Sequence, residues 1–266
     1  MKKVIVPLLA AVAVLVLAVC FAGCIGEDSF AGEHLLVYSG AGLKAPMAEI
    51  AQVFEEKYGV VVELTYGGSG VLISQMETTK LGDVFVPGGE PDYAIASNKG
   101  LVNEDYQLIA YHIPVLATLK DNPLNIQTVA DLAKPGVRLA LGDEASTSIG
   151  KAGVQIFAKA GITDTVSSNV AVTGSTINEV VTALATGNAD AAILTMDAAN
   201  KNKDKFEIIE IPVKENFILI TPIGVTSFTE NAELAQLFAD FAASEEGKSI
   251  FEKHGFPSYP NEKYTP

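Results

Sequence analysis

The chain is poor in cysteine, tryptophan and arginine, and each shortage narrows what the protein can do. Its 266 residues include two cysteines, no tryptophan and a single arginine, Arg138. Because Cys20 and Cys24 both lie near the N-terminus, the rest of the chain can form no disulfide, cysteine metal site or thiol nucleophile. Proteins that capture carboxylates or phosphoesters commonly use a bidentate arginine. Arg138 begins a predicted strand, whereas ligands bind at the carboxyl ends of strands, so we expect it to be a surface charge. The ligand must then be one that neutral donors can satisfy.

Positive charge is scarce as well. Lysine and arginine together number 18 against 32 acidic residues, which gives a net charge of −14 at neutral pH. So acidic a surface argues against nucleic acid as a partner and against electrostatic docking on anionic lipid. It also cannot attract an anion from a distance, so a bound anion must be held by local dipoles.

The ionisable side chains show no pattern typical of a catalytic or metal centre. The histidines are scattered, which favours surface or hinge positions and predicts no bound metal and no cofactor. Asp83 and Asp92 flank the loop 87–89 without a partner base, and Lys151 is expected to face water. The three histidines are His34, His112 and His254.

The N-terminus has the form of a lipoprotein leader. Lys2 and Lys3 precede an uncharged apolar run over residues 4–19, and Phe21-Ala22-Gly23-Cys24 has the small-small-Cys form of a processing site. We predict a signal peptide over 1–23, lipidation of Cys24 and a tether over 24–33. An uncleaved membrane anchor is the alternative, but the run is short for a span. Either way, the remaining chain of about 240 residues lies on the outer face of the cell membrane, with room for one large domain or two lobes.

Two glycine-serine loops are the most informative feature that is present. Each follows a predicted strand and precedes a predicted helix: Tyr38-Ser39-Gly40-Ala41-Gly42-Leu43 and Tyr66-Gly67-Gly68-Ser69-Gly70-Val71. A strand, a glycine turn and a helix together point free backbone N–H groups at an anion, and serine adds a hydroxyl donor. Two such loops in adjacent units predict one small anion held between them.

Two further loops in the second half of the chain fit the same interpretation. Residues 142–150 join a strand to a helix and carry three hydroxyls, and residues 174–179 open another helix, with Thr176 and Glu179 spaced as a capping box. Serine and threonine before a helix are more often caps than ligands. Four hydroxyl-rich loops nevertheless favour ligand binding, because their helix N-termini together offset a divalent charge.

Short apolar runs alternate with helical patterns from Glu33 to Phe256. A 3.6-residue apolar stripe predicts a helix over 46–58, and further helices are predicted over 72–79, 92–100 and 149–160. Apolar runs between them predict strands, for example over 139–143 and 189–194. This alternation predicts an α/β fold with mostly parallel sheets covered by helices on both faces.

In the order and spacing of these segments, the chain resembles the molybdate-binding proteins of ABC importers, in the branch common in archaea. The resemblance spans residues 35–256 and implies an α/β, bilobal class II periplasmic-binding-protein fold. Two doubly wound lobes are then joined by two crossing segments, near 111–114 and 220–223. The implied first lobe is 34–112 plus 223–266, and the second is 113–222. The segments that carry the resemblance are 38–43, 66–72, 82–86, 141–144 and 186–194.

The resemblance also implies residues of the site. Ser69 matches the family's serine in the second loop. Gly42 falls where the first-loop serine is expected, so that hydroxyl is lost, and Ser39 is the nearest replacement. Two backbone N–H donors of the second lobe fall on Ile149 and Ile177, where the side chain matters little.

Two departures bear on the ligand. Thr195 stands where the family has a tyrosine, and Leu194 stands where an archaeal relative has one of two extra carboxylates, which favours simple tetrahedral binding. Tungstate is nearly indistinguishable from molybdate in size and charge, and sulfate is smaller. Phosphate keeps a proton that needs a hydrogen-bond acceptor in the site. Asp143 or Glu144 could accept it, although the simpler interpretation of both residues is that they are acids exposed on a loop.

The sequence therefore predicts a binding protein without catalysis, which captures molybdate or tungstate between two lobes and delivers it to the permease of an ABC importer. One alternative is a carrier for sulfate, phosphate or a dicarboxylate. The scarcity of arginine counts against the dicarboxylate. The other is an anchored hydrolase of phosphate or sulfate esters with Ser69 or Ser148 as nucleophile, which would need a metal or a positioned base. We expect a monomer. The predicted ligand-binding residues are Ser39, Gly40, Ala41, Gly42, Gly68, Ser69, Ser148, Ile149, Thr176, Ile177 and Thr195.

Overall fold

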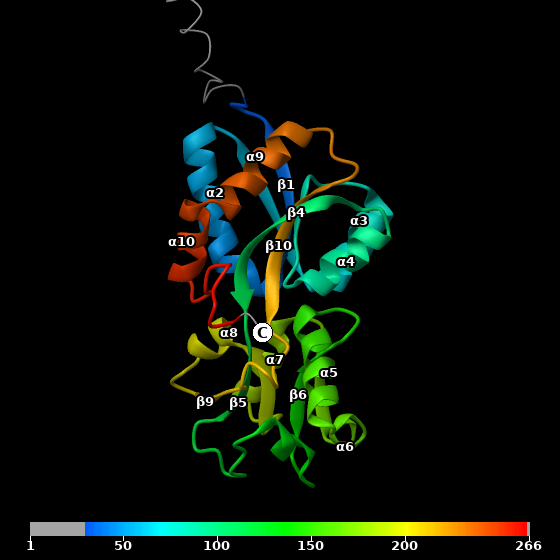
Figure 1. The fold of residues 1–266 in the computed structure, drawn as a ribbon, viewed down its shortest axis with the longest axis vertical. Helices are drawn as coiled ribbons and strands as arrows, with labels where there is room; N and C mark the ends of the chain where they lie inside the picture. The colour runs from blue at the N-terminus through cyan, green and yellow to red at the C-terminus, as the bar shows by residue number, and fades with distance from the viewer. Residues whose placement is uncertain (1–29, 265–266) are drawn as a thin grey trace, which may run out of the picture.

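The computed structural model describes residues 30–264, which form two lobes stacked along the long axis (Figure 1). Each lobe is built on a five-stranded sheet. The predicted signal peptide and Cys24 lie outside the described residues. Within residues 30–264, no helix combines the length and apolar character that crossing a membrane requires.

The first lobe contains the sheet β2-β1-β3-β10-β4. Strand β1 pairs in parallel with β2 and β3, whereas β10 runs antiparallel to both β3 and β4. The strands are β1 (His34–Gly40), β2 (Val61–Gly67), β3 (Val84–Val86), β4 (Val102–His112) and β10 (Leu219–Thr226).

The second lobe contains the sheet β7-β6-β8-β5-β9. Strand β6 pairs in parallel with β7 and β8, and β5 runs antiparallel to β8 and β9. The strands are β5 (Pro114–Leu119), β6 (Leu139–Gly142), β7 (Val170–Gly174), β8 (Ala191–Thr195) and β9 (Phe206–Glu210).

Both sheets are mixed, and in each of them four strands run in one direction, as the expectation of mostly parallel sheets requires, while one strand runs against the others. The strand that runs against the others is the one by which the chain enters from the other lobe: β5, which follows β4, in the second lobe, and β10, which follows β9, in the first. A strand that carries the chain across to another lobe is not reached by a helical crossover, and only such a crossover imposes the parallel direction. The alternation of apolar runs and helical patterns in the sequence does not indicate the direction of these crossing strands.

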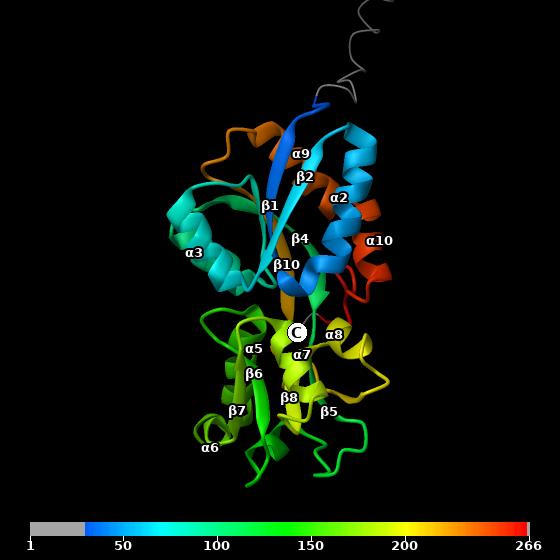
Figure 2. The ribbon, with the colours of Figure 1, turned by 180° about the vertical axis from the view of Figure 1, so that it is seen from behind.

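Helices cover both faces of the first sheet, as the alternation predicted (Figures 1 and 2). In α2, Met47, Ile50 and Phe54 are fully buried at helical spacing, and the helix ends at Gly59 in the left-handed conformation with φ 68°. On the opposite face, Leu72 and Phe85 belong to a separate core. The first-lobe helices are α2 (Lys44–Tyr58), α9 (Ala232–Ala243) and α10 (Glu245–Lys253) on one face, and α3 (Ser69–Thr79) and α4 (Glu90–Asn98) on the other.

The second lobe has one continuous apolar core around its sheet. Helix α5 contacts β6, β8 and β5, and α7 contacts all four of β5 to β8. The helical elements here are η2 (Val129–Ala133), α5 (Ser148–Ala160), α6 (Thr163–Ser167), α7 (Ile177–Ala185) and α8 (Met196–Asn200); η1 (Ala41–Leu43) belongs to the first lobe and precedes α2.

The chain crosses between the lobes twice. Strand β4 continues into β5 through Ile113, and the return leads from β9 to β10. Leu219 at the start of β10 packs in the second lobe's core, whereas Ile223 packs in the first lobe's core. Because β4 and β10 are hydrogen-bonded neighbours, the two crossings lie side by side and can bend together. We retain 34–112 plus 223–266 and 113–222 as the proposed lobes.

Candidate ligand-binding site between the lobes

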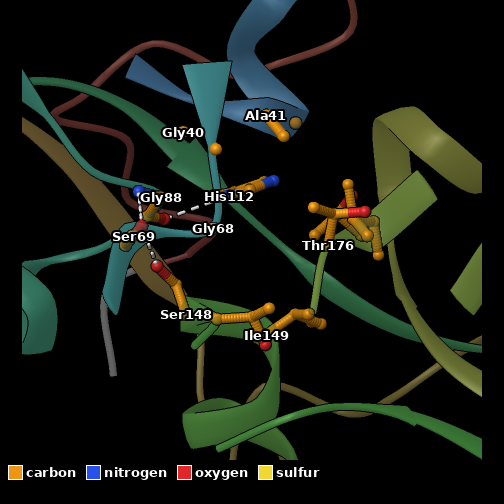
Figure 3. Close-up of a pocket in the computed structure, with 14 residues that line it drawn as sticks. Gly40, Ala41, Gly68, Ser69, Gly88, His112, Ser148, Ile149 and Thr176 are labelled. Atoms are coloured by element: carbon orange, nitrogen blue, oxygen red, sulfur yellow. Dashed lines mark hydrogen bonds between the residues drawn. The ribbon is translucent and has the colours of Figure 1, made fainter. Parts of the chain in front are cut away.

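A small cavity of about 30 Å³ lies where the two lobes meet (Figure 3). A cavity needs roughly 10–15 Å³ to hold one water, so this one suits a compact ligand of a few heavy atoms. It is lined by Gly40, Ala41, Gly42, Gly67, Gly68, Ser69, Gly88, His112, Thr147, Ser148, Ile149, Thr176, Ile177 and Thr195.

The loops predicted to bind an anion converge on this cavity. Helix α3 begins at Ser69, α5 at Ser148 and α7 at Ile177, and η1 begins at Ala41 and runs into α2. The first N–H groups of a helix have no partner inside it and carry the positive end of the helix dipole. Four such ends, two from each lobe, face one space, which favours negative charge there.

The two threonines before α5 and α7 act as caps. The Thr147 hydroxyl accepts a hydrogen bond from Gly150 N at 3.0 Å, and the Thr176 hydroxyl accepts one from Glu179 N at 3.3 Å. The Glu179 carboxylate reaches back to Ser175 N at 2.8 Å, one residue before the capping-box partner that the spacing predicted. Capping and cavity lining are therefore compatible roles for Thr176.

All the predicted ligand-binding residues except Ser39 line the cavity. Ser39 is fully buried, and its hydroxyl lies 3.5 Å from its neighbour's carbonyl, Gly40 O. Four lining residues were not predicted: Gly67, Gly88, Thr147 and His112. The loop 142–150 had been singled out and could have yielded Thr147, whereas His112 had been set aside as one of three scattered histidines.

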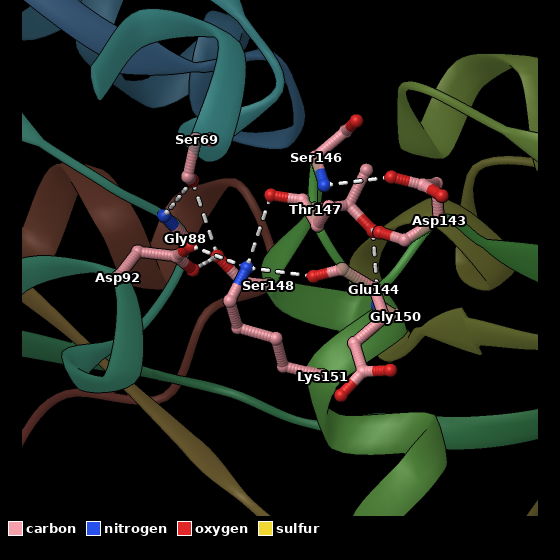
Figure 4. Close-up of polar contacts among 12 residues, drawn as sticks. Ser69, Gly88, Asp92, Asp143, Glu144, Ser146, Thr147, Ser148, Gly150 and Lys151 are labelled. Atoms are coloured by element: carbon pink, nitrogen blue, oxygen red, sulfur yellow. Dashed lines mark hydrogen bonds and ion pairs between the residues drawn. The ribbon is translucent and has the colours of Figure 1, made fainter. Parts of the chain in front are cut away.

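A chain of hydroxyls connects the lobes at one side of the cavity (Figure 4). Gly88 N donates to Ser69 Oγ at 3.1 Å, Ser69 Oγ lies 3.1 Å from Ser148 Oγ, and Ser148 donates to the Asp92 carboxylate. Since a carboxylate only accepts, the Ser148 proton points at Asp92. The Ser69 proton can then be donated to Ser148 or to a ligand in the cavity.

Asp92 and Lys151 form an ion pair that closes this side of the site. Asp92 on α4 is fully buried, and its Oδ1 lies 2.9 Å from Nζ of Lys151 on α5. The Lys151 side chain is only 15% exposed and also donates to the Glu144 carbonyl at 2.8 Å. The expectation that Lys151 faces water was therefore wrong: the closed lobes bury it against an acid that is distant in the sequence.

His112 presents a polar edge to the cavity from the end of β4. It is 5% exposed, its Nδ1 lies 2.9 Å from Gly88 O, and its Nε2 lies 3.6 Å from Asp197 Oδ1. A separation of 3.6 Å is too long for a hydrogen bond. Nε2 thus has no hydrogen-bond partner among the described residues, and the same holds for the fully buried Thr195 hydroxyl. Both are polar atoms that a ligand could satisfy.

Asp197 carries the charge that balances this edge. Burial works to raise the pKa of its carboxyl, but the nearby His112 and Lys201 outweigh burial and hold the pKa below its ordinary value. The Lys201 Nζ lies 3.3 Å from Asp197 Oδ2. The carboxylate is therefore ionised and favours a positive charge on its neighbours.

The second glycine loop is pressed against the second lobe. Gly70 N donates to Ser146 O at 3.0 Å. A Cβ on Gly70 would stand 2.0 Å from Ala145 O, and one on Gly68 would stand 2.4 Å from Ser175 O. No larger residue fits at either position while the lobes are closed.

Other charged residues singled out in the sequence lie apart from the cavity. Arg138 pairs with Asp190 at 2.6 Å and is half exposed, as expected of a surface charge. Asp143 accepts a hydrogen bond from Ser146 N at 2.8 Å, and its contacts with Ser146 lower its pKa. Within residues 30–264, no three His, Cys, Asp or Glu side chains gather as a metal site would require.

The chain belongs to the family of bacterial extracellular solute-binding proteins, whose sequence pattern matches residues 35–257. A protein of Haemophilus influenzae provisionally named as a binding protein is 32% identical over 222 residues, 84% of this chain and 90% of its own length. The lipoprotein YvgL of Bacillus subtilis, provisionally named as an ABC transporter substrate-binding protein, is 24% identical over 258 residues, 96% of this chain and 98% of YvgL. The molybdate-binding protein ModA of Mycobacterium tuberculosis is 25% identical over 224 residues, 84% of each chain.

Solved structures share the two-lobed fold. The sulfate-binding protein SubI of Mycobacterium tuberculosis matches with a TM-score of 0.77 at 18% identity, over 87% of this chain and 89% of SubI. The periplasmic molybdate-binding protein of Azotobacter vinelandii matches with a TM-score of 0.71 at 18% identity, over 84% of this chain and 98% of that one. The predicted bilobal periplasmic-binding-protein fold is confirmed.

Proposed function

We propose that this protein captures a tetrahedral oxyanion, molybdate or tungstate, in the cavity between its lobes and presents it to the permease of an ABC importer. The observation that carries the proposal is the convergence of four helix N-termini on a cavity of about 30 Å³ between the lobes. Neutral and dipolar donors suffice for such an anion, which fits a chain with one arginine, placed elsewhere. The likeness to ModA and to sulfate- and molybdate-binding structures supports the same class of ligand.

The donors on offer favour an anion that carries no proton. Backbone N–H groups at Ile149 and Ile177 and the hydroxyls of Ser69 and Thr195 can each donate to an oxygen of the ligand. Asp92, the nearest carboxylate to the hydroxyl chain, is already committed to Ser148 and Lys151. No carboxylate lines the cavity to accept the proton of hydrogen phosphate, which disfavours phosphate relative to molybdate, tungstate and sulfate.

Calorimetric titration with molybdate, tungstate, sulfate and phosphate tests the proposal. We expect molybdate and tungstate to bind with a Kd below about 1 μM, a standard free energy beyond about −8 kcal/mol. We expect sulfate to bind more weakly, and phosphate to bind least. Failure of all four to bind in this range contradicts the proposal.

The Ser148–Asp92 contact is the one observation that favours the hydrolase alternative, because it joins a hydroxyl to a carboxylate. The Asp92 carboxylate is already paired with Lys151, however, so it is not free to serve as a general base. We therefore propose binding without catalysis. Turnover of a chromogenic phosphate or sulfate ester that is lost in Ser148→Ala would reverse this choice.

We further propose that the protein is a monomer anchored through lipid on Cys24, at the outer face of the cell membrane. The small-small-Cys sequence before Cys24 and the lipoprotein name of YvgL support this. Membrane fractionation should find the wild-type protein with the membrane and Cys24→Ser released or unprocessed. Identical fractionation and processing of the two would contradict the anchor.

A further inference from the structure

The inference concerns His112, the lining residue whose orientation is fixed by a bond outside the cavity. A carbonyl oxygen only accepts, so the contact of 2.9 Å between His112 Nδ1 and Gly88 O places a proton on Nδ1. Nε2 is then the atom left for the cavity, and it has no hydrogen-bond partner among residues 30–264 (Figure 3). A polar atom in a side chain that is 5% exposed is costly to leave unsatisfied.

The surroundings favour a proton on Nε2 as well. In the neutral ring its lone pair would stand 3.6 Å from a carboxylate oxygen, Asp197 Oδ1, so two acceptors would face each other. The protonated ring instead presents an N–H and a positive charge to that carboxylate. Facing the ring are Asp197 on α8, which is paired with Lys201 just after that helix, the Gly88 carbonyl on the loop after β3, and the Phe256 ring at 5.4 Å. The Asp92–Lys151 pair lies beyond Ser148 and is neutral as a unit.

Gly42 lies beside the Nε2 edge of the imidazole. A Cβ built on Gly42 would lie 3.5 Å from His112 Cε1 and 3.6 Å from His112 Nε2, in ordinary contact. A hydroxyl carried by residue 42 would therefore project beside the Nε2 edge of the ring. With glycine at position 42, the chain lacks the hydroxyl that the family resemblance implies, and His112 presents its N–H at that place.

We infer that His112 is a ligand-binding residue that supplies, through a protonated Nε2, the donor that Gly42 lacks. This rests on the proposed function, since it takes the ligand to be an oxyanion in this cavity. The imidazolium supplies a full positive charge where the other donors supply dipoles. It therefore selects for a dianion without a proton, because Nε2–H cannot accept the proton of hydrogen phosphate. Binding that uses this second N–H of an imidazolium should weaken in alkaline solution, where an imidazole ring keeps only one proton.

Calorimetry of the purified protein with molybdate and with sulfate, from about pH 6 to about pH 9, spans the range in which histidine ordinarily titrates. We expect wild-type affinity to fall by at least about tenfold across this range, since hydrogen bonds to charged groups contribute about twice as much as neutral ones. His112→Asn retains a donor for Gly88 O but removes Nε2, and should bind about tenfold to a hundredfold more weakly at the lower pH. His112→Gln offers a neutral donor and should bind with an intermediate affinity that does not change with pH.

Gly42→Ser in the His112→Asn background restores a hydroxyl at the vacant place and should recover part of the affinity, with no pH dependence. Wild-type protein that binds neither anion overturns the proposed function itself. Wild-type binding that His112→Asn and His112→Gln match at every pH overturns only the role of His112. Should the variants fail to fold, ring-nitrogen NMR of the wild type decides. The His112 Nε2 resonance should shift on saturation while those of His34 and His254 do not, and no shift contradicts the inference.

Discussion

The two glycine-serine loops look alike in sequence and do different work in the fold. In the first loop, Gly42 lines the cavity, and an added Cβ would make only ordinary contacts there. In the second loop, Gly68 and Gly70 press on carbonyl groups of the opposite lobe, and an added Cβ would stand 2.4 Å and 2.0 Å from them. The first loop thus leaves room for the ligand and for His112, and the second holds the lobes together. A glycine pattern that suggests anion binding can equally mark the surface where two lobes close.

The hydroxyls differ in the same way. Ser39 of the first loop does not line the cavity, whereas Ser69 of the second loop begins the bonds that run through Ser148 to the Asp92–Lys151 pair. If the second loop holds the lobes closed, a substitution that removes one of these bonds should lower ligand affinity more than any substitution in the first loop.

Lys151→Met should have the largest effect. Without Lys151, closure of the lobes buries the Asp92 charge with only the Ser148 hydroxyl as a partner. Because a buried charge without its counter-charge is costly, we expect the substitution to weaken ligand binding by about 3 kcal/mol. Calorimetry with molybdate measures the loss.

Lys99→Met is the matched control, because Lys99 pairs with Glu77 on the surface of the first lobe, where both side chains are over 40% exposed and little affinity depends on them. The double variant Asp92→Asn with Lys151→Met should recover part of the loss, since no charge is then buried alone. A single variant that binds like the wild type would show that the pair does not hold the lobes closed.

Gly70→Ala should have the next largest effect. Its Cβ would overlap Ala145 O, so closure has to shift the backbone at a cost of about 2 kcal/mol, while the separate lobes remain intact. Ligand affinity should fall with little change in the free energy of unfolding without ligand. Small-angle scattering should show that saturating molybdate no longer compacts the molecule as it does the wild type.

Gly153→Ala in α5 is the control for Gly70→Ala, because a Cβ there would meet only Phe157 Cε2 at 3.9 Å. Equal affinities for the two variants would refute the steric account.

Ser69→Ala should weaken binding by about 1–2 kcal/mol. It leaves Gly88 N without its acceptor and removes a hydroxyl that can donate to the ligand. Ser74→Ala, on the same helix but exposed and bonded only to Gly70 O, should bind like the wild type. Titration of both variants with molybdate measures the difference, and unchanged affinity in Ser69→Ala would remove Ser69 from the site.

Gly42→Ala should have the smallest effect, below about 0.5 kcal/mol, because its Cβ fits beside His112 and Ile177 at 3.5 Å. A loss as large as that of Gly70→Ala, measured by the same titration, would erase the distinction between the two loops.

Local sequence signals located most of the cavity lining but not the bonds that close it. Helix caps, glycine turns and apolar stripes are set by neighbours in the sequence, so Ser69 and Thr176 could be placed from the pattern, whereas Ile149 was implied by the family resemblance. Asp92 and Lys151 come from different lobes and meet only in the closed fold, so nothing in their own segments distinguished them from surface charges.

His112 shows the same limit. Its role depends on Gly88, Asp197 and the space beside Gly42, which come from three separate segments. The reversed strands β5 and β10 were not predicted for a related reason, because the direction of a crossing strand is set by the lobe it comes from.

Anomalous diffraction from crystals grown with molybdate tests the central claim most directly. The account predicts one strong molybdenum peak in the cavity between the lobes, within hydrogen-bond distance of the Ile149 and Ile177 N–H groups and the Thr195 hydroxyl. A peak confined to the protein surface, or an empty cavity in crystals grown at saturating molybdate, would contradict it.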